Sequence, residues 1–324
     1  MKSLVDAAEK LRICGRDCFA PYDFVFTACR DPESSPRTDR GLFVEVRVSP
    51  QQLPHNLEMI VGERSPFSGQ RHLAAVENFI EKELGSYGLD LESDYFSYRA
   101  AKFRNIIGRT GPRRASLVIV GAHLDSVTGT PGADDNASGA AVLLEAARLL
   151  ARTNLRSQVL FCAFNLEELN MIGSSHFAKQ LKASGAKLSG MVSLEMVGYT
   201  DLRPGSQKYP PGLAWLYPNR GDFIGLIGNW NSGSFLRAFA RQMRQVPGLP
   251  VETLSVPGNG AFIPAVRLSD HSPFWDQGYP ALMITDTAFF RNPHYHGPTD
   301  KLETLNIDFM AKVCEGVIRG VLAL

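Results

Sequence analysis

Residues 118–139, VIVGAHLDSVTGTPGADDNASG, decide the fold of this 324-residue chain. The stretch begins in an apolar run at residues 117–120, which is typical of a buried strand. His123 and Asp125 follow the strand, and Asp134 and Asp135 precede the small residues that open a helix. Because an apolar strand cannot bury charged groups without partners, these side chains must face a crevice or solvent. Open α/β sheets bind ligands at this edge.

Outward from this stretch, apolar strand patterns alternate with helical patterns. Strands are expected at residues 92–98, 101–108, 116–120, 158–164, 188–197, 223–228 and 281–285. Helices are expected at residues 70–84, 137–150, 174–181, 232–243 and 307–322. The alternation predicts an α/β fold: a single three-layer domain, with a mostly parallel mixed sheet and helices on both faces.

The first part of the chain carries weaker signals. Residues 1–40 form an N-terminal segment of unknown structure, and residues 41–324 are expected to form one catalytic domain. A strand is expected at residues 42–48. Ser49 and Pro50 suggest the start of a helix, which Pro54 would interrupt or delay.

Composition excludes several classes of protein. A net charge of +1 gives no electrostatic footprint for nucleic acid, and no apolar run is long enough for a membrane span. The five cysteines are scattered, and Cys14 and Cys18 lack the second pair that a zinc site of cysteines needs. With no secretory signal visible, we expect a cytoplasmic protein. Its oligomeric state is not fixed by the sequence.

Acidic and histidine residues recur at the ends of the expected strands. Glu167 and Glu168 follow the strand at 158–164, Glu195 lies within the next strand, and His294 and His296 follow the strand at 281–285. Because the ends of parallel strands converge, these residues can meet in space. Carboxylates and imidazoles without cysteine suit Zn²⁺ or a similar divalent ion in a catalytic site.

Each of these signals has a simpler explanation when taken alone. The His123–Asp125 pair could be a hydrogen-bonded loop, Asp134 and Asp135 could cap a helix, and the two glutamates could be solvated. Glu195 differs, because a carboxylate inside an apolar strand is costly to bury unless it is paired or bound to metal. The conjunction of all of them, at consecutive strand ends, favours a functional site.

The segments GAHLDS, PGADDNASG, LEMVGY and NPHYHGPTD, with the Glu167–Glu168 pair between them, resemble the two-zinc aminopeptidase family in order and spacing. Its relatives include glutamate carboxypeptidases, glutaminyl cyclases and the transferrin-receptor ectodomain. The resemblance covers residues 70–324. It implies a zinc exopeptidase with two Zn²⁺ per chain that hydrolyses the N-terminal bond of a peptide with a free N-terminus.

By this resemblance, each residue of the site receives a role. One zinc would be held by His123 and Glu195, the other by Glu168 and His296, and Asp134 would bridge the two. The family usually has aspartate where this chain has Glu195, so a more weakly held second zinc is a hypothesis.

The resemblance also assigns the catalytic groups. Glu167 would be the general base and Asp125 would orient the His123 ring. Tyr295 would donate to the oxyanion, unless it is only a packed aromatic residue. Asp135 would start the helix or lie beside the ligands, and Asp270 of the DHSPF segment would either orient pocket groups or cap a short helix.

Two rival activities remain open at this point. Glutaminyl-peptide cyclases of this scaffold use a single zinc and typically have tryptophan where this chain has Tyr295. A carboxypeptidase would need a cationic clamp, for which Arg203, Arg220 and Arg291 are candidates. A substrate pocket could be lined by the loop at residues 200–220 together with Trp230, Phe289 and Phe290.

Overall fold

The computed structural model describes residues 48–113 and 116–324. The described residues all belong to one compact unit, Glu45–Leu324. The expectations for residues 1–40, for the domain boundary that follows them and for Cys14 and Cys18 therefore lie outside the described residues. The same holds for nearly all of the strand expected at residues 42–48.

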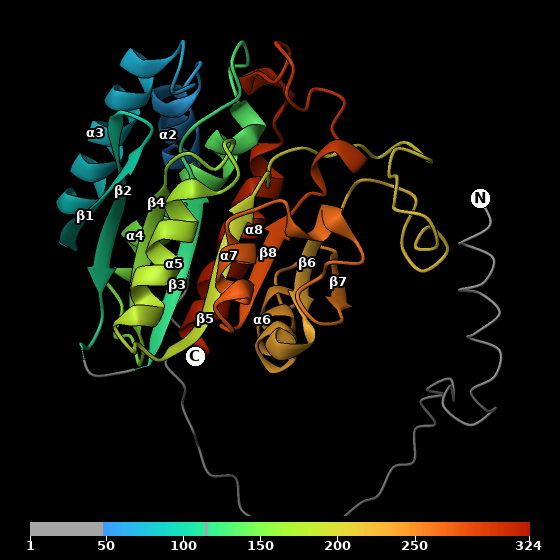
Figure 1. Cartoon of the computed structure of the whole chain (residues 1–324). Coiled ribbons are helices and arrows are strands. Elements are labelled where there is room, and N and C mark those ends of the chain that lie inside the picture. Colours follow the sequence, from blue (N-terminus) through green and yellow to red (C-terminus); the bar gives the residue numbers. More distant parts are fainter. Residues whose placement is uncertain (1–47, 114–115) are drawn as a thin grey trace, which may run out of the picture. The chain divides into compact units, whose positions relative to one another are not determined.

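One mixed sheet forms the centre of this unit, with strands in the order β1-β2-β4-β3-β5-β8-β6-β7 (Figure 1). The strands are β1 Asp90–Tyr98, β2 Ala101–Thr110, β3 Leu117–His123, β4 Gln158–Phe164, β5 Leu188–Glu195, β6 Ile224–Asn229, β7 Val251–Val256 and β8 Ala281–Thr285. The pairs β4–β3, β3–β5, β5–β8 and β6–β7 are parallel, and the other neighbouring pairs are antiparallel. The predicted mostly parallel mixed sheet is confirmed.

Helices cover both faces of this sheet. They are α2 Gln52–Ile60, α3 Gln70–Ser86, α4 Gly139–Leu150, α5 Ile172–Ala183, α6 Gly233–Met243, α7 His271–Asp276 and α8 Ile307–Leu322. One apolar cluster joins one face to α2, α3, α4, α6 and α8, and a second joins the other face to α5 and α7 (Figure 1). The predicted three layers are therefore present.

The central strands are mostly apolar because both of their faces are buried. In β3, Val120 belongs to the first cluster and its neighbour Ile119 to the second. Met191 and Val192 divide in the same way in β5. Side chains alternate between the faces of a strand, so a sheet covered by helices on both sides requires such largely apolar runs.

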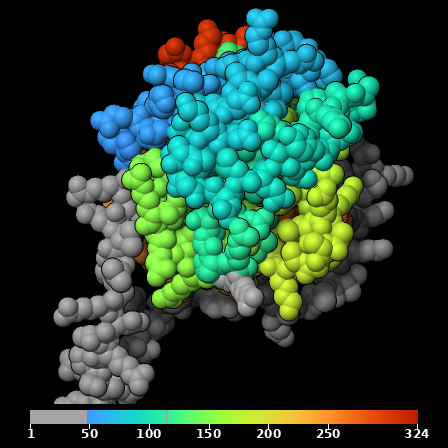
Figure 2. Space-filling model, turned by 90° about the vertical axis from the view of Figure 1, so that its left-hand side faces the viewer, coloured from blue at the N-terminus to red at the C-terminus, as the bar shows by residue number. Residues whose placement is uncertain are grey.

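The outer part of the sheet is covered differently. α3 packs over β1 and β2, and residues 70–110, in cyan, form much of the surface seen from that side (Figure 2). At the start of α2, the Ser49 hydroxyl accepts hydrogen bonds from the Gln51 and Gln52 amides, at 3.4 and 3.3 Å. Pro54 lies in the first turn, where a missing N–H costs nothing, and the helix begins before it at Gln52, so the proline neither delays nor interrupts the helix.

Strand β7 was not expected from the sequence. Its residues, VETLSV, show no strict alternation of apolar with polar residues, and it lies at the edge of the sheet beyond β6. A short strand at the edge of a sheet has a partner strand on one side only, so its sequence pattern is weak.

In the described part of the chain, no helix is both long and apolar enough to cross a membrane.

Candidate metal centre

Two clusters of metal-ligand side chains lie at the edge where β3, β4, β5 and β8 end. The first contains His123, Asp135 and Glu195, and the second contains Asp135, Glu168 and His296. Within each cluster the candidate ligand atoms lie within 4.8 Å of one another. Asp135 belongs to both. The parallel pairing of these strands brings together residues that are more than 170 positions apart in sequence.

The His123 ring is held so that one nitrogen faces the cluster. Its Nδ1 lies 3.2 Å from the carbonyl oxygen of Asp125, which can only accept a hydrogen bond. Nδ1 must therefore carry a proton, and Nε2 is the ring nitrogen directed at Asp135 and Glu195, 3.2 and 3.7 Å away. The Asp125 carboxylate is farther from Nδ1, at 3.7 Å, so the backbone of Asp125 shares the predicted orienting role.

Asp135, rather than Asp134, lies between the two histidines, which corrects the predicted bridge. Its two oxygens lie 3.2 Å from Nε2 of His123 and 3.1 Å from Nε2 of His296. Asp134 points away from them and accepts hydrogen bonds from the Gly198 amide at 2.9 Å and the Asn292 side chain at 2.7 Å. The backbone at Asp135 is not helical (φ −105°, ψ 89°), so it does not start the helix either.

A third carboxylate fixes this arrangement. Asp300 accepts the backbone amides of Asp134 and Asp135 at 2.9 and 3.1 Å, which orients the two aspartates relative to the sheet. Burial, together with the charge of Asp286, raises the pKa of Asp134 well above its ordinary value. Burial likewise raises the pKa of Asp286 to about 6. The two buried acids can share one proton, so Asp134 is poorly suited to bind a metal ion. It instead accepts the hydrogen bonds that hold this part of the site together.

The Glu167–Glu168 turn is tied to the end of β3 through Asp125. The Asp125 carboxylate accepts the Glu167 amide at 3.0 Å and the Glu168 amide at 3.1 Å. Glu167 is thereby held with its carboxylate 4.0 Å from Nε2 of His123, and Glu168 with its carboxylate 3.3 Å from Nε2 of His296. Burial, reinforced by Glu195, raises the pKa of Glu167 well above its ordinary value.

Glu195 has a partner of its own in this chain. Its Oε2 accepts a hydrogen bond from the Ser269 hydroxyl at 2.8 Å, and Ser269 is in turn 2.8 Å from the Ser193 hydroxyl. The other oxygen faces His123. The additional methylene of glutamate is therefore accommodated in a fixed position by a hydrogen bond from the segment before α7.

His296 and Tyr295 form one wall of the site. Their rings stack at 3.7 Å between centroids and 18° between planes. Partial burial lowers the pKa of His296, but ion pairs with Asp135 and Glu168 outweigh this effect and raise the pKa to about 10. Tyr295 is half-buried, and its hydroxyl makes no hydrogen bond to another described residue. It lines the adjacent cavity, so the predicted role as a donor stays a prediction.

Asp270 is fully buried before α7 and makes no capping hydrogen bond to that helix. Burial raises its pKa to about 7, although the nearby His123 lowers it. The helix-cap alternative is thereby disfavoured. The hypothesis that Asp270 acts on neighbouring groups of the site stays open.

Several residues that hold the site were not recognised from the sequence. Arg64 is fully buried and donates to the carbonyls of Ile60, Gly62, Leu124, Pro131 and Gly132. It thus joins the two loops that carry Asp125 and Asp135. Asp286, Asn292 and Asp300 also hold the site and were not recognised from the sequence. The segment NPHYHGPTD contains two of them, but a lone arginine at position 64 carries no motif that would reveal it.

The residues present fit divalent metal ions. Among the described residues, Nε2 of His123 and Oε1 of Glu168 are buried without a hydrogen-bond partner. Unpaired buried polar atoms are costly, and a cation in each cluster would satisfy both. Two imidazoles and three carboxylates form the nitrogen and oxygen donor set that suits zinc in an open, catalytic site.

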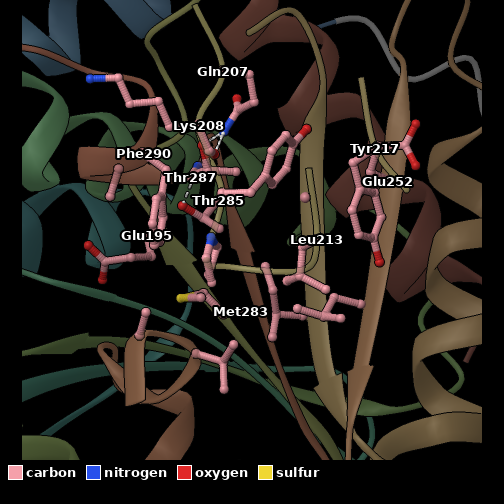
Figure 3. A pocket seen from close by; sticks show the side chains of 18 of the residues that line it. Glu195, Gln207, Lys208, Leu213, Tyr217, Glu252, Met283, Thr285, Thr287 and Phe290 are labelled. Carbon is pink, nitrogen blue, oxygen red and sulfur yellow. Dashed lines mark hydrogen bonds between the residues drawn. The ribbon is translucent and has the colours of Figure 1, made fainter. Parts of the chain in front are cut away.

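A cavity of about 110 Å³ adjoins the first cluster, and both Glu195 and Tyr295 line it. Its walls include Leu213 and Tyr217 of the loop at residues 200–220, and its floor includes Met283 of β8 (Figure 3). The structure therefore places the predicted loop, and with it Phe289 and Phe290, at the pocket. Trp230 does not line it and is 69% exposed, which corrects that expectation.

The sequence profile of peptidase family M28 matches residues 105–321. This chain belongs to peptidase family M28. The predicted family and metallopeptidase class are confirmed.

Two relatives and one solved structure are similar to this chain. It is 38% identical to the uncharacterised protein YfbL of Escherichia coli over 83% of this chain and 87% of YfbL. It is 32% identical to the aminopeptidase YwaD of Bacillus subtilis over 63% of this chain, but it spans only 40% of YwaD. The LapA aminopeptidase of Legionella pneumophila has the same fold, with a TM-score of 0.66, 19% identity, and coverage of 85% of this chain and 72% of LapA.

Proposed function

We propose that this M28 peptidase removes the N-terminal residue from peptides, with Zn²⁺ as its cofactor and two ions per chain. The observation that carries the proposal is the position of Asp135 between His123 and His296, next to a cavity that Glu195 and Tyr295 line. The aminopeptidase YwaD, at 32% identity, supports the same activity.

In this proposal His123 and Glu195 would hold one zinc, Glu168 and His296 the other, and Asp135 both. Bound zinc supplies Lewis acidity toward the scissile carbonyl and lowers the pKa of water. Such ligands must be deprotonated to bind, and Asp125 supports this by keeping the His123 tautomer and the Glu167–Glu168 turn in place.

Glu167 is the proposed general base. Its raised pKa makes the carboxylate a stronger proton acceptor than an exposed glutamate, and the protonated acid can then deliver the proton to the leaving amine. Tyr295 is the proposed donor to the oxyanion, because its hydroxyl is free and its ring is fixed on His296. The carboxylates of Glu167 and Glu195 would attract the substrate ammonium.

The cationic residues argue for an aminopeptidase rather than a carboxypeptidase. Arg203 is exposed and paired with Asp201, and Arg220 is exposed. Arg291 is buried and donates to Gln207 and to the Tyr199 carbonyl. None of these three candidate clamps lines the cavity. A terminal carboxylate would therefore find none of these three arginines at the cavity, where the lining cation is Lys208.

The test is a substrate panel assayed with and without chelator: aminoacyl-anilides, N-blocked dipeptides and peptides that begin with glutamine. We expect turnover of free-amine anilides, loss of that turnover with chelator and its return with zinc. Cyclisation of glutamine peptides without any anilide turnover would instead identify a cyclase, and turnover of N-blocked dipeptides alone would identify a carboxypeptidase.

A further inference from the structure

A second carboxylate lies in the same row of the sheet as Glu195. The strand registers pair Glu195 with Thr285, Thr285 with Gly225, and Gly225 with Glu252 of β7. All four residues line the cavity. Residues directly opposite each other on neighbouring strands point to the same face, so Glu195 and Glu252 lie on one face of the sheet, at opposite ends of the row of residues that lines the cavity. Figure 3 shows them on opposite sides of it.

The floor between these carboxylates is open and apolar. Gly225 has no side chain there, and a Cβ at this position would meet the Thr285 carbonyl oxygen at 3.4 Å and Ile227 at 3.5 Å, which are ordinary contacts. Leu213 and Met283 add apolar surface. The rings of Tyr209 and Tyr217 stack at 5.7 Å, and the Tyr217 hydroxyl is fixed by a bond to the Thr253 carbonyl.

Within the described part of the chain, Glu252 makes no hydrogen bond and no ion pair. It is half-buried, and burial raises the pKa of its carboxyl above the ordinary value. Arg244 is the neighbouring cation, but its guanidinium donates to the Val251 carbonyl instead, at 3.3–3.4 Å. Lys208 lines the cavity too, yet its side chain extends away from Glu252 (Figure 3). The cavity thus ends in a carboxylate that has no protein partner.

Resting on the proposed aminopeptidase function, we propose that this cavity selects peptides whose N-terminal residue is lysine or arginine, with Glu252 binding the cationic end of that side chain. Three strand spacings separate the backbones of Glu195 and Glu252 by about 14 Å. An extended lysine spans about 8 Å between its two nitrogens, and a charge-assisted hydrogen bond at each end adds roughly 3 Å. The lengths match. The methylenes would lie on the apolar floor, and a guanidinium would also find the faces of the two tyrosines.

The test compares lysine, arginine and norleucine anilides on the zinc-loaded full chain, because norleucine has the same stem as lysine without the charge. We expect the wild type to favour lysine and arginine over norleucine by about tenfold or more in kcat/KM. Glu252→Gln should lower kcat/KM for lysine and arginine by about tenfold or more, and change that for norleucine by less than about threefold. The exposed Glu58 on α2 provides a matched control: Glu58→Gln removes the same charge and should change none of the three.

A second variant tests whether the substrate side chain lies over Gly225 on the floor of the cavity. Gly225→Val should reduce kcat/KM for lysine, arginine and norleucine alike, while alanine anilide retains its rate because a short side chain does not reach Gly225. Turnover of norleucine or alanine anilide with no preference for lysine and arginine, or an unchanged preference in Glu252→Gln, would overturn the role of Glu252 and leave the aminopeptidase intact. Failure to turn over any anilide would instead overturn the proposed function itself.

Discussion

The metal centre and the pocket share one edge of the sheet but are built in opposite ways. Three of the five candidate ligands, His123, Asp135 and Glu195, are buried, and Asp125 and Asp300 fix the backbone of Glu168 and Asp135 through amide hydrogen bonds. The pocket is walled by a loop, and its acidic end, Glu252, has no partner among the described residues. Chemistry requires ligand positions held within fractions of an ångström, whereas recognition of a side chain needs only a shape and a charge.

This difference predicts that substitutions in the metal centre abolish turnover of every substrate. Substitutions in the pocket should instead alter the preference for one substrate over another. Four predictions test the contrast, from the largest expected effect to the smallest.

The largest effect is expected for Glu167→Gln. The amide cannot accept the proton of the attacking water, so kcat for a cleaved anilide should fall about 10³-fold or more. Glu167 is not among the five candidate ligands, so the zinc content, measured by atomic absorption, should remain that of the wild type. Retained turnover would remove Glu167 from the role of base. Glu58→Gln again serves as the control.

The adjacent aspartates offer a matched pair of variants. Asp135→Asn should weaken zinc binding by about a hundredfold or more, because both clusters lose a charged ligand. Asp134→Asn should weaken it less than about threefold, because an amide resembles the protonated acid that can share a proton with Asp286. Titration of metal-free protein with zinc measures both constants. Equal losses would contradict the assignment of Asp135.

Without metal, the crowded acids should make stability depend on pH. Burial raises the pKa of Glu168 and Asp270 to about 7, and the ion pairs described above raise that of His296 to about 10. Each folded-state value exceeds the unfolded one, so the folded protein holds more protons, and stability should fall as pH rises from about 4 to 7 and on to about 10.

Zinc should reverse this trend, because it binds deprotonated ligands. At about 1,000 times its dissociation constant it adds about 4 kcal/mol to the free energy of unfolding. Thermal unfolding at pH 6, 7.5 and 9, with zinc or with chelator, should therefore show a gap that widens with pH. A gap that narrows would mean that these groups do not form the metal site.

The smallest effect is expected in the pocket wall. Leu213→Ala removes apolar contact in a partly open cavity, so kcat/KM for norleucine anilide should fall only several-fold, mostly through KM. Trp215 lies on the same loop, is 88% exposed and does not line the cavity, so Trp215→Ala is the control and should have no effect. A loss in kcat alone would place Leu213 in the chemistry rather than in substrate binding.

The central strands and the residues at their ends could be predicted because burial on both faces leaves a continuous apolar signal. β4 and β8 match their expected residues 158–164 and 281–285. Acids and histidines that interrupt such a pattern at its end are visible for the same reason, and the structure brings His123, Glu168, Glu195 and His296 together. The edge strand β7 was not predicted because only its two end residues, Val251 and Val256, are buried.

By itself, the sequence determined the alternating α/β layers and the set of residue types that meet at one sheet edge, since both follow from local periodicity. Tertiary structure alone decided which of two adjacent aspartates faces the histidines, because the answer depends on hydrogen bonds to Asp134 from Gly198 and Asn292, distant in the chain. It likewise revealed Arg64 beneath the site and Glu252 across the pocket from Glu195. Such placements arise from strand register and loop packing, which no local pattern encodes.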